Sequence, residues 1–375
     1  MKILIITQNF PPIEGGISTH TYEMAKNFSI YRHKVLVVAP VKKNTLEFDK
    51  EQNFRTKRSP QVYNAFSRFL VTLMYSLSAA FKFKPDIIYT THWKNAGVVA
   101  TIISIFLKIP HILAVNGTEI NFPRSQKFNY KLFRFVADRA KKIVALGSFQ
   151  VNLLKKLDIN ENKITVVPEG VDFSKFKDKN DDLINKLKEK YHTGTKKVLL
   201  TVGRLVPRKG HRNVILALKE IIKIYPQIVY IIIGSGPEQE NLKKLVNNLK
   251  LNNHVIFAGF VSEEEKIAFY YLSDIFIMPN TIVDGDLEGF GIVFAEANAC
   301  GKPVIGGKSG GTSDIIKDGF NGFLVNPENI DEIKDKILKL LKNDGLRNQM
   351  GQYGQNLVKT EFNYLNISKK ILNQF

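Results

Sequence analysis

Short apolar runs alternate with amphipathic stretches along the first half of the chain. The apolar runs are short enough for buried strands, and the stretches between them repeat their apolar residues with helical spacing. Predicted strands cover residues 2–7, 34–39, 86–90, 111–115, 142–145 and 163–167, and predicted helices cover residues 18–29, 62–81, 96–107, 127–140 and 148–156. Strands that alternate with helices of this length indicate βαβ units and a parallel sheet.

The same alternation begins again after residue 195. Predicted strands cover residues 198–202, 229–233, 255–258, 275–278 and 304–305, and predicted helices cover residues 214–224, 238–249, 263–272, 292–299 and 331–342. We therefore predict an α/β protein with two doubly wound, Rossmann-like parallel-sheet domains that face each other across a cleft. The domains span residues 1–170 and 196–355, joined by a polar linker over 171–195, and a C-terminal helix over 356–375 could return to the first domain. Ligands bind at the carboxyl ends of the strands in such sheets.

Composition narrows the class of protein further. The 375 residues are 44% hydrophobic and 24% charged, which excludes a disordered, collagenous or fibrous chain. The single cysteine, Cys300, excludes an internal disulfide framework and a cysteine-based zinc cluster. The apolar start of the chain is too short for a signal peptide, and the uncharged stretches 69–81 and 95–107 fall short of the about 20 residues that a membrane span needs. We expect a cytoplasmic protein, peripheral on the inner face of the cell membrane.

The positive charge is concentrated in the first half of the chain. The net charge is +19, and residues 1–170 hold 25 Lys and Arg against 11 Asp and Glu, so 14 of the 19 excess charges lie there. This asymmetry favours an anionic partner, which could be a membrane surface, a nucleic acid or a phosphorylated acceptor. A lysine-rich surface that serves only solubility is the alternative.

Four glycine-containing turns each follow a predicted strand, at residues 11–16, 203–210, 234–239 and 288–296. Glycines let a backbone approach an anionic ligand, and a helix amino terminus favours negative charge. In the second turn, Arg204 and Lys209 can converge on a diphosphate. In the fourth turn, Glu288 and Glu296 suit hydrogen bonds to neutral hydroxyls, because a carboxylate that faced a diphosphate would repel it.

The ordered set of motifs carries a resemblance. It consists of Gly15-Gly16, Gly203-Arg204 with Lys209-Gly210, Gly234 with Gly236-Pro237, and Glu288 with Glu296 in an E-x₇-E pattern. Together these motifs resemble the retaining GT-B-fold glycosyltransferases of family 4, over nearly the whole chain. The stretch from residue 279 to 311 is similar to the phosphatidylinositol mannosyltransferases that use GDP-mannose.

The resemblance implies roles for individual residues. Arg204 and Lys209 would hold the donor diphosphate as it leaves, Glu288 would bind the donor sugar, and Glu296 would bind the nucleotide ribose. Further donor contacts implied by the resemblance come from Gly15, Gly16, Gly236, Phe260, Val261, Phe290, Gly291 and Ile292. The resemblance also implies that the domain of residues 1–170 binds the acceptor and that the domain of residues 196–355 binds the nucleotide sugar. The implied co-substrate is a nucleotide sugar, with no cofactor and no metal.

One position departs from the family pattern. Asn116 stands where the family often has a histidine, and an amide cannot titrate near neutral pH. A retaining reaction can use the leaving phosphate as the base, so Asn116 is still predicted as a catalytic-site residue. His20, His92 and Glu119 are candidates on the acceptor side.

Asp284 and Asp286 form a D-x-D pair, which is the metal and nucleotide site of a different glycosyltransferase fold. This pair lies in a polar loop just before the E-x₇-E motif, so we predict turn formation and capping instead. The expected enzyme needs no metal.

The predicted helix 62–81 has an apolar stripe and basic flanks. The stripe comprises Val62, Phe66, Phe69, Leu70, Leu73, Leu77 and Phe81, and the basic residues are Arg55, Lys57, Arg58, Arg68, Lys82 and Lys84. A helix of this kind can lie on an anionic bilayer, and an ordinary core helix would show the same stripe. We predict a packed helix whose basic end touches lipid.

The leading hypothesis is a retaining hexosyltransferase that moves mannose from GDP-mannose to a membrane-associated lipid or polysaccharide acceptor. Three alternatives stay open: a UDP-sugar donor, a sugar-nucleotide epimerase or phosphorylase on the same fold, and a basic nucleic-acid-binding protein. The glycine turns describe a small-molecule cleft and so disfavour the last of these; no nucleic-acid partner is expected.

Overall fold

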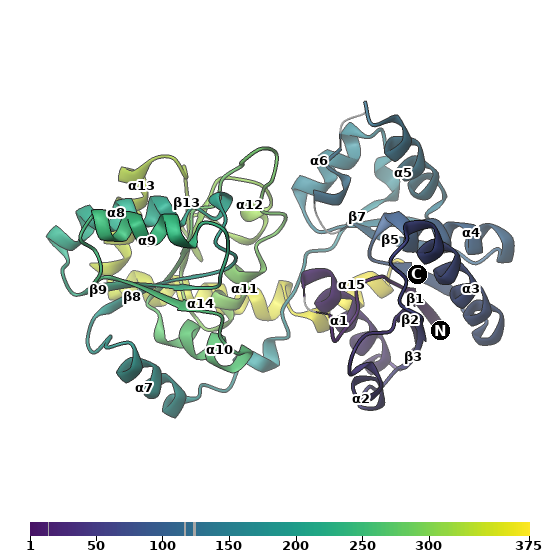
Figure 1. Ribbon diagram of the computed structural model, residues 1–375, viewed down its shortest axis with the longest axis horizontal. Helices are drawn as coiled ribbons and strands as arrows, with labels where there is room; N and C mark the ends of the chain where they lie inside the picture. Colours follow the sequence, from purple (N-terminus) through teal and green to yellow (C-terminus); the bar gives the residue numbers. More distant parts are fainter. Residues whose placement is uncertain (14, 116–117, 123–124) are drawn as a thin grey trace. The chain divides into compact units, whose positions relative to one another are not determined.

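The computed structural model describes residues 1–13, 15–115, 118–122 and 125–375, and the chain divides into two units. Unit 1 comprises Met1–Glu169 together with Tyr364–Phe375, and unit 2 comprises Gly170–Asn363 (Figure 1). The last helix, α15 (Tyr364–Leu372), therefore belongs to the same unit as the first strand.

Unit 1 is built on a seven-stranded parallel sheet with the order β3-β2-β1-β4-β5-β6-β7. Its strands are β1 (Lys2–Ile6), β2 (Lys34–Pro40), β3 (Arg55–Ser59), β4 (Ile87–Thr90), β5 (His111–Val115), β6 (Lys142–Ala145) and β7 (Ile164–Val166). Both faces of β1 are buried: Ile3 and Ile5 join one apolar cluster, and Leu4 and Ile6 join another. A strand covered on both faces reads as a continuous apolar run, which is why the sequence pattern revealed it.

Helices cover both faces of this sheet. They are α1 (Gly16–Ile30), α2 (Thr45–Lys50), α3 (Ala65–Phe83), α4 (Val98–Leu107), α5 (Lys127–Arg139) and α6 (Ser148–Lys156), with short helical turns η1 (Trp93–Gly97), η2 (Thr118–Ile120) and η3 (Glu161–Lys163). Helices α1 and α15 share one apolar cluster, through side chains such as Phe28 and Ile367. Helices α3 and α4 supply Ala80 and Val99 to the cluster on the other face.

Unit 2 repeats the design with a six-stranded parallel sheet in the order β10-β9-β8-β11-β12-β13. Its strands are β8 (Lys197–Val202), β9 (Ile228–Ile233), β10 (Val255–Gly259), β11 (Ile275–Met278), β12 (Val304–Gly307) and β13 (Gly322–Val325). The predicted class, an α/β fold of two doubly wound parallel sheets, is confirmed.

Helices also cover both faces of the second sheet (Figure 1). They are α7 (Asp181–Lys190), α8 (His211–Ile224), α9 (Gln239–Asn248), α10 (Glu263–Leu272), α11 (Ile292–Ala299), α12 (Thr312–Ile315), α13 (Ile330–Leu341) and α14 (Asp344–Glu361), with short turns η4 (Phe173–Phe176) and η5 (Pro207–Lys209). Helices α7, α10, α11 and α14 pack on one face of the sheet, and α8, α9 and α13 pack on the other.

The segment 171–195 differs from the expected polar linker. It contains η4 and α7, and Phe173, Phe176, Ile184 and Leu187 are buried in the core of unit 2. Val171 is buried there as well, and a few buried apolar side chains in a mostly charged segment are not evident from its composition.

Candidate functional site

The strand order of unit 2 reverses between β8 and β11, which are hydrogen-bonded neighbours although β9 and β10 lie between them in the chain. In doubly wound sheets, ligands bind outside the carboxyl ends of the strands at this switch point. The loop after β8 carries Lys209, and the loop after β11 carries Glu288. The tertiary structure thus brings together two of the residues predicted to contact the donor.

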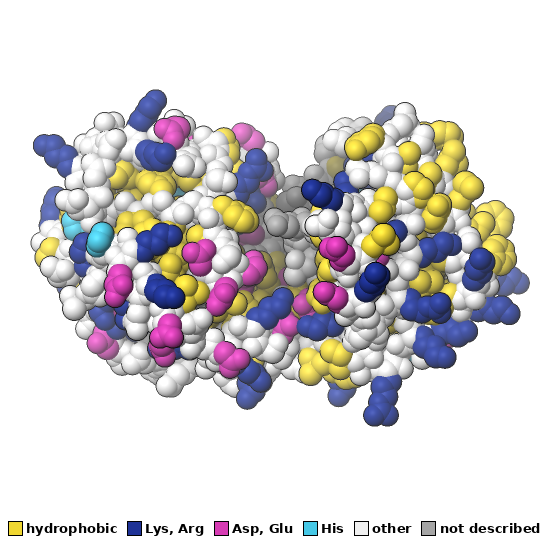
Figure 2. Space-filling view, turned by 60° about the horizontal axis from the view of Figure 1, so that its bottom comes forward, with side chains coloured by type: hydrophobic (Ala, Val, Ile, Leu, Met, Phe, Trp, Pro, Cys, Tyr) yellow, Lys and Arg dark blue, Asp and Glu magenta, His cyan; other side chains and the backbone are white. Residues whose placement is uncertain are grey.

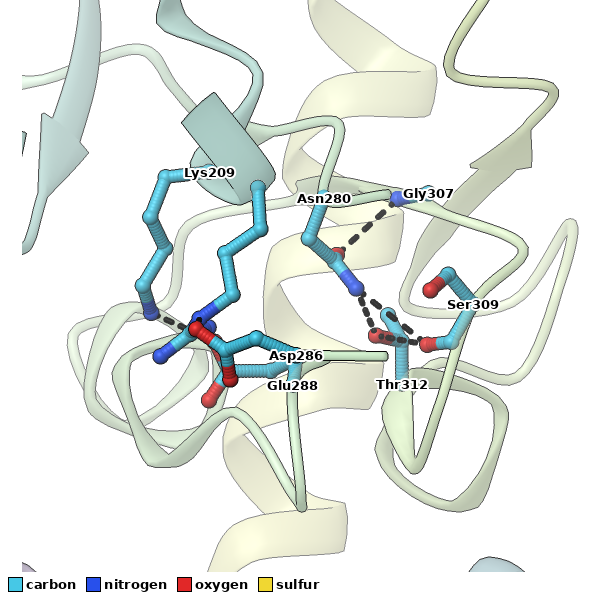
Figure 3. Close-up of polar contacts among 8 residues, drawn as sticks. Lys209, Asn280, Asp286, Glu288, Gly307, Ser309 and Thr312 are labelled. Carbon is cyan, nitrogen blue, oxygen red and sulfur yellow. Dashed lines mark hydrogen bonds and ion pairs between the residues drawn. The ribbon is translucent and has the colours of Figure 1, made fainter. Parts of the chain in front are cut away.

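Two cations converge on Glu288. Lys209 Nζ lies 2.5 Å from Glu288 Oε2, and Arg208 Nη1 lies 2.8 Å from the same oxygen. Arg208 Nε also bonds Asp286 Oδ2 at 2.8 Å. The side chains of Lys209 and Glu288 are largely buried, and Figure 3 shows Lys209 directed toward the loop that bears Asp286 and Glu288. Burial alone would raise the pKa of Glu288, but Lys209 and Arg208 outweigh it and hold that pKa below its usual value.

Backbone contacts join the two loops that carry these charges. Thr281 N donates to Arg208 O at 2.8 Å. Gly210 has a φ of 75°, and a Cβ there would collide with the carbonyl of Pro279. Glycine is therefore required at the start of α8, both for its backbone angle and for the close approach of the second loop.

Asn280 fastens a third loop at the same edge of the sheet. Its Nδ2 donates to Ser309 O at 3.2 Å and to Thr312 Oγ1 at 2.8 Å, while its Oδ1 accepts from Gly307 N at 3.2 Å (Figure 3). Gly311 N donates to Glu288 O at 3.0 Å. The buried hydroxyl of Ser309 has no hydrogen-bond partner among the described residues, so this loop offers a polar group as well as support.

Helix α11 presents its amino terminus at this site. Gly291 precedes the helix in the left-handed region, with φ 86° and ψ 52°, and no side chain caps the first turn. Phe290 is buried against Phe362, so its side chain anchors the turn in the core. The backbone N–H groups at Ile292 and the residues after it are free of a side-chain cap, which suits an anion.

Glu296 lies within α11 and is bonded by two side chains of α10. Tyr270 Oη donates to Glu296 Oε2 at 2.7 Å, and Lys266 Nζ lies 3.1 Å from Oε1. Burial would lower the pKa of Lys266, but Glu296 and Glu263 outweigh it and raise that pKa. Burial and the Glu296 charge raise the pKa of Tyr270 well above its usual value. Tyr270 and Lys266 thus hold the carboxylate of Glu296 in a fixed position.

The remaining predicted residues of unit 2 follow β8, β9 and β10. Arg204 follows β8 and is exposed. Gly236 approaches the backbone of Leu205 so closely that a Cβ would collide with it, so packing alone explains this glycine. Phe260 follows β10 with 81% of its surface exposed, and Val261 packs against the core.

In unit 1, Gly15 directly precedes α1 and Gly16 is the first residue of that helix, and a Cβ at either position would meet open space. His20, in contrast, is inside the fold. Its Nδ1 lies 2.8 Å from Glu169 Oε1 and its Nε2 lies 3.0 Å from Tyr89 Oη. A side chain that is 1% exposed is not placed to contact an acceptor, so the structure assigns His20 to the core of unit 1.

The other acceptor-side candidates lie after β4 and β5. His92 follows β4, and its Nδ1 accepts from Lys94 N at 3.1 Å. Burial lowers the pKa of His92, so the ring is neutral at pH 7. Glu119 lies in η2, where its carbonyl accepts from Trp93 Nε1 at 2.9 Å. The predicted catalytic-site residue Asn116 lies outside the described residues.

Sequence reasoning did not select Arg208 or Asn280 as site residues. Arg208 is adjacent to a predicted residue, and only the turn of η5 shows that it, and not Arg204, meets Glu288. Asn280 had a usable signal in the sequence, because its polar side chain comes two residues after the apolar run of β11, at the carboxyl end where ligands bind.

The chain folds into two doubly wound parallel-sheet units, which is the architecture of the GT-B glycosyltransferases. The switch point of unit 2 holds cations, a carboxylate and a helix amino terminus. The known families agree: residues 184–357 match the family described as glycosyl transferases group 1, and residues 14–175 match glycosyltransferase family 4. The chain belongs to these glycosyltransferases, and it is an enzyme of that class.

Relatives and solved structures of several organisms are similar along the chain. A GDP-mannose-dependent alpha-(1-6)-phosphatidylinositol monomannoside mannosyltransferase of Mycobacterium tuberculosis is 27% identical, covering 99% of this chain and 97% of the relative. The capsular polysaccharide biosynthesis glycosyltransferase CapM of Staphylococcus aureus is 31% identical, covering 78% and 77%. The crystal structure of Anabaena Alr3699/HepE in complex with UDP has a TM-score of 0.84 at 23% identity, covering 100% of this chain and 99% of that one.

Proposed function

We propose that this protein is a retaining, metal-independent mannosyltransferase that moves mannose from GDP-mannose to a lipid or polysaccharide acceptor. The observation that carries the proposal is the contact of Lys209 and Arg208 with Glu288 at the switch point of unit 2. Cations for a diphosphate and a carboxylate for hydroxyls lie side by side there, as a nucleotide sugar requires.

Different residues of unit 2 bind different parts of the donor. Lys209, with Arg208 and Arg204, neutralises the diphosphate, and the amino terminus of α11 adds N–H donors. Glu288 accepts hydrogen bonds from the sugar hydroxyls. Glu296, fixed by Lys266 and Tyr270, accepts from the ribose, and the exposed ring of Phe260 offers a face for the base.

The proposed reaction exchanges one bond at the anomeric carbon. The bond between the sugar C1 and the diphosphate oxygen breaks, and the acceptor hydroxyl oxygen bonds C1 on the same face. The hydroxyl proton passes to the leaving phosphate oxygen. Lys209 and Arg208 stabilise the negative charge that develops on the leaving group, so no metal is needed for that purpose. Among the described residues, no three His, Cys, Asp or Glu side chains gather as a metal site, and Arg208 holds Asp286 of the D-x-D pair.

Mannose from GDP-mannose is supported by the name of the mycobacterial relative, which also names a phosphatidylinositol-based acceptor. CapM supports a polysaccharide product, and the UDP bound to the Anabaena protein supports a UDP-sugar as the alternative donor. The donor base is therefore the first property to measure.

The proposed partner of unit 1 is an anionic membrane surface. The predicted stripe of α3 divides: Phe69, Leu73 and Leu77 pack on the core, whereas Phe66 and Phe81 are exposed. On the outer surface of α3, Phe66 is 69% exposed and Met74 is 68% exposed. Phe106 of the neighbouring α4 is 77% exposed. Figure 2 shows apolar side chains beside Lys and Arg on unit 1, at the right. Two flanking cations turn inward instead, because Arg58 pairs with Asp49 and Lys57 bonds Ser78.

No helix in the described part of the chain is both long enough and apolar enough to span a bilayer. The proposed contact is therefore peripheral: the exposed rings enter the interface, and Arg68, Lys82 and Lys84 meet anionic headgroups.

The experiment for the donor is a thermal-shift comparison of GDP, UDP and ADP in the presence of EDTA. A ligand at 100 times its dissociation constant stabilises by about 2.7 kcal/mol, which is easily seen. A shift with GDP alone, followed by transfer from GDP-mannose in EDTA, supports the proposal. A shift with UDP alone would contradict GDP-mannose and indicate a UDP-hexose as the donor. If no nucleotide gives a shift, either with EDTA or with Mg²⁺, the proposed donor site is contradicted.

A further inference from the structure

A pocket of about 650 Å³ opens at the carboxyl-terminal edge of the unit 1 sheet, where β1, β2 and β3 end. Its volume is in the range of small-molecule binding sites. Gln8 and Asn9 line it after β1, Lys42 and Lys43 after β2, and Tyr63 and Arg68 at the start of α3. The pocket belongs wholly to unit 1, whereas the Lys209–Glu288 site belongs to unit 2.

One side of the pocket is cationic. Lys42, Lys43 and Arg68 form no ion pair with any described residue, and none of the described lining residues is acidic. Asp49, in the neighbouring α2, is already bonded by Arg58 at 2.7 Å. Three cations without carboxylate partners, gathered around a cavity, make it a site for an anion.

Arg68 also shapes the pocket. Its Nη2 donates to Tyr63 O at 2.9 Å and its Nε donates to Val62 O at 3.3 Å, which holds the loop before α3. These two bonds use part of a guanidinium that has five N–H donors, so donors remain for a ligand oxygen.

The other side of the pocket offers neutral hydrogen-bonding groups in a fixed orientation. Gln8 Nε2 donates to Thr72 Oγ1 at 3.0 Å, and Thr72 Oγ1 in turn donates to Arg68 O at 2.7 Å. This chain leaves the Gln8 carbonyl oxygen as an acceptor for a ligand hydroxyl. The backbone N–H of Asn9 donates to Thr7 Oγ1 at 3.1 Å, and Asn9 lines the cavity.

Tyr63 adds an apolar surface at the rim, where 82% of the residue is exposed. An exposed aromatic ring beside hydrogen-bonding groups suits the C–H face of a sugar, because one surface is apolar and its surroundings are polar. Cations, amides and a ring therefore line one cavity, and each recognises a different part of one kind of molecule.

We infer that this pocket binds a phosphate-bearing sugar or cyclitol as the acceptor, with its phosphate against Lys42, Lys43 and Arg68 and its hydroxyls against Gln8 and Asn9. This inference rests on the proposed transferase function, since it names the class of acceptor. The phosphate comes either from a free sugar phosphate or from the phosphodiester headgroup of a lipid.

The first test is a calorimetric titration of the full chain, pre-saturated with the nucleotide that stabilises it, so that the unit 2 site is occupied. The probes are α-mannose 1-phosphate, α-glucose 1-phosphate, mannose and inorganic phosphate. We expect at least one sugar phosphate to bind at least tenfold more tightly than either mannose or inorganic phosphate. Equal or weaker binding of both sugar phosphates, with no stronger binding of the lipid probe below, would overturn the inference.

Charge reversal locates the binding. Lys42→Glu/Lys43→Glu changes two cations just after β2, and the matched control Arg32→Glu/Lys34→Glu changes two exposed cations at the amino-terminal end of β2, at the opposite edge of the sheet. We expect the first pair to weaken binding at least tenfold and the control to leave it unchanged. Lys42→Arg/Lys43→Arg should retain binding, which separates a lost charge from a disturbed fold. An equal effect of both reversals would overturn the assignment to this pocket.

Vesicles distinguish the two sources of phosphate. Phosphatidylinositol presents a cyclitol phosphodiester, and phosphatidylglycerol presents the same charge without the ring. If Lys42→Glu/Lys43→Glu reduces binding to phosphatidylinositol vesicles more than to phosphatidylglycerol vesicles, the acceptor is lipid-borne. If only the soluble sugar phosphates respond, it is free. If neither responds, the inference fails.

The outcome is separable from that of the proposed function. Nucleotide thermal shifts report on unit 2, and we expect them to be the same in Lys42→Glu/Lys43→Glu as in the unchanged protein. Loss of the nucleotide shift in the unchanged protein would count against the proposed donor, while the titration without nucleotide would still report on the pocket.

Discussion

Lys209 and Glu288 are 79 positions apart in the chain, and their side chains meet at 2.5 Å on largely buried atoms. Lys209 ends the short turn before α8, and Glu288 lies in the loop before α11, so each is delivered by a strand of the switch point. Because both charges are largely removed from water, Lys209 is compensated by Glu288, and Glu288 is compensated by Lys209 and Arg208 together.

Removing either charge should remove transfer and leave a folded protein. Lys209→Ala and Glu288→Ala should each lower kcat by about 10²-fold or more, the magnitude seen when one electrostatic stabiliser of a developing charge is lost. Arg208 remains to compensate Glu288 in the first variant, so its melting temperature should fall only moderately. Lys243→Ala, which breaks an exposed pair with Glu240, is the control and should leave both quantities unchanged. Full activity in both variants would contradict the assignment of Lys209 and Glu288 to the donor site.

A single methyl group at Gly311 should disturb the sugar site without touching a charge. A Cβ there would collide with the carbonyl of Gly289, and Gly311 N holds Glu288 O at 3.0 Å. We expect Gly311→Ala to raise the KM for the donor at least tenfold, because the loop of Glu288 must shift. Gly345→Ala, in a helix with room for a methyl group, is the matched change and should have no effect. An unchanged donor KM in Gly311→Ala would show that the loop of Glu288 accommodates the methyl group without moving the sugar site.

Two buried histidines should make the protein acid-sensitive. Burial, with a smaller contribution from Lys163, lowers the pKa of His111 to about 4, and burial with Lys209 does the same for His211. Since the unfolded chain binds protons from about pH 6.5 downward and the folded one does not, stability is full above 6.5 and falls as the pH drops toward 4. Each histidine accounts for about 3 kcal/mol of this loss.

Replacing His111 tests this directly, because neither of its ring nitrogens has a hydrogen-bond partner among the described residues. His111→Leu should flatten the dependence of the unfolding free energy on pH between 6.5 and 4, measured by urea denaturation. His192→Asn, at an exposed histidine, should leave the slope as it is. A slope unchanged by His111→Leu would mean that this ring is protonated in the folded protein.

Exposed apolar side chains on α3 should govern membrane association. Phe66→Ser/Met74→Ser should weaken binding to phosphatidylglycerol vesicles at least tenfold, since burying one large apolar side chain contributes about 1.5–3 kcal/mol. Ile224→Ser removes an exposed apolar side chain of unit 2 and serves as the control in the same co-sedimentation assay. Equal binding by all three proteins would assign the association to charge alone or to another surface.

Much of the fold was predictable because buried parallel strands are apolar on both faces. The runs at β1, β8 and β11 were recognised on this basis, and the two-sheet class follows from their alternation with helices. The strand β3 was missed, since Arg55–Ser59 is polar and charged at the edge of its sheet. Edge strands carry such charges without losing their single row of hydrogen bonds.

The candidate site was predictable as a set of motifs and less so as a set of contacts. Glu288, Glu296 and Lys209 were identified from their spacing and neighbours, and the structure shows what each of them bonds. Arg208 was passed over in favour of Arg204, because a linear sequence does not show which side of the turn faces the loop after β11. His20 was predicted as an acceptor-side candidate, and only the packing of α1 shows that it is buried beside Glu169 and Tyr89.

By itself, the sequence determined the class of this protein: hydrophobic periodicity specifies the alternating strands and helices, and glycines mark the turns where a backbone must approach another group. The tertiary structure decided which charged side chains meet. Lys209 and Glu288, and likewise the cations around the unit 1 pocket, come from separate loops. Their proximity depends on the order of strands in each sheet, which is a property of long-range packing and leaves no local pattern in the chain.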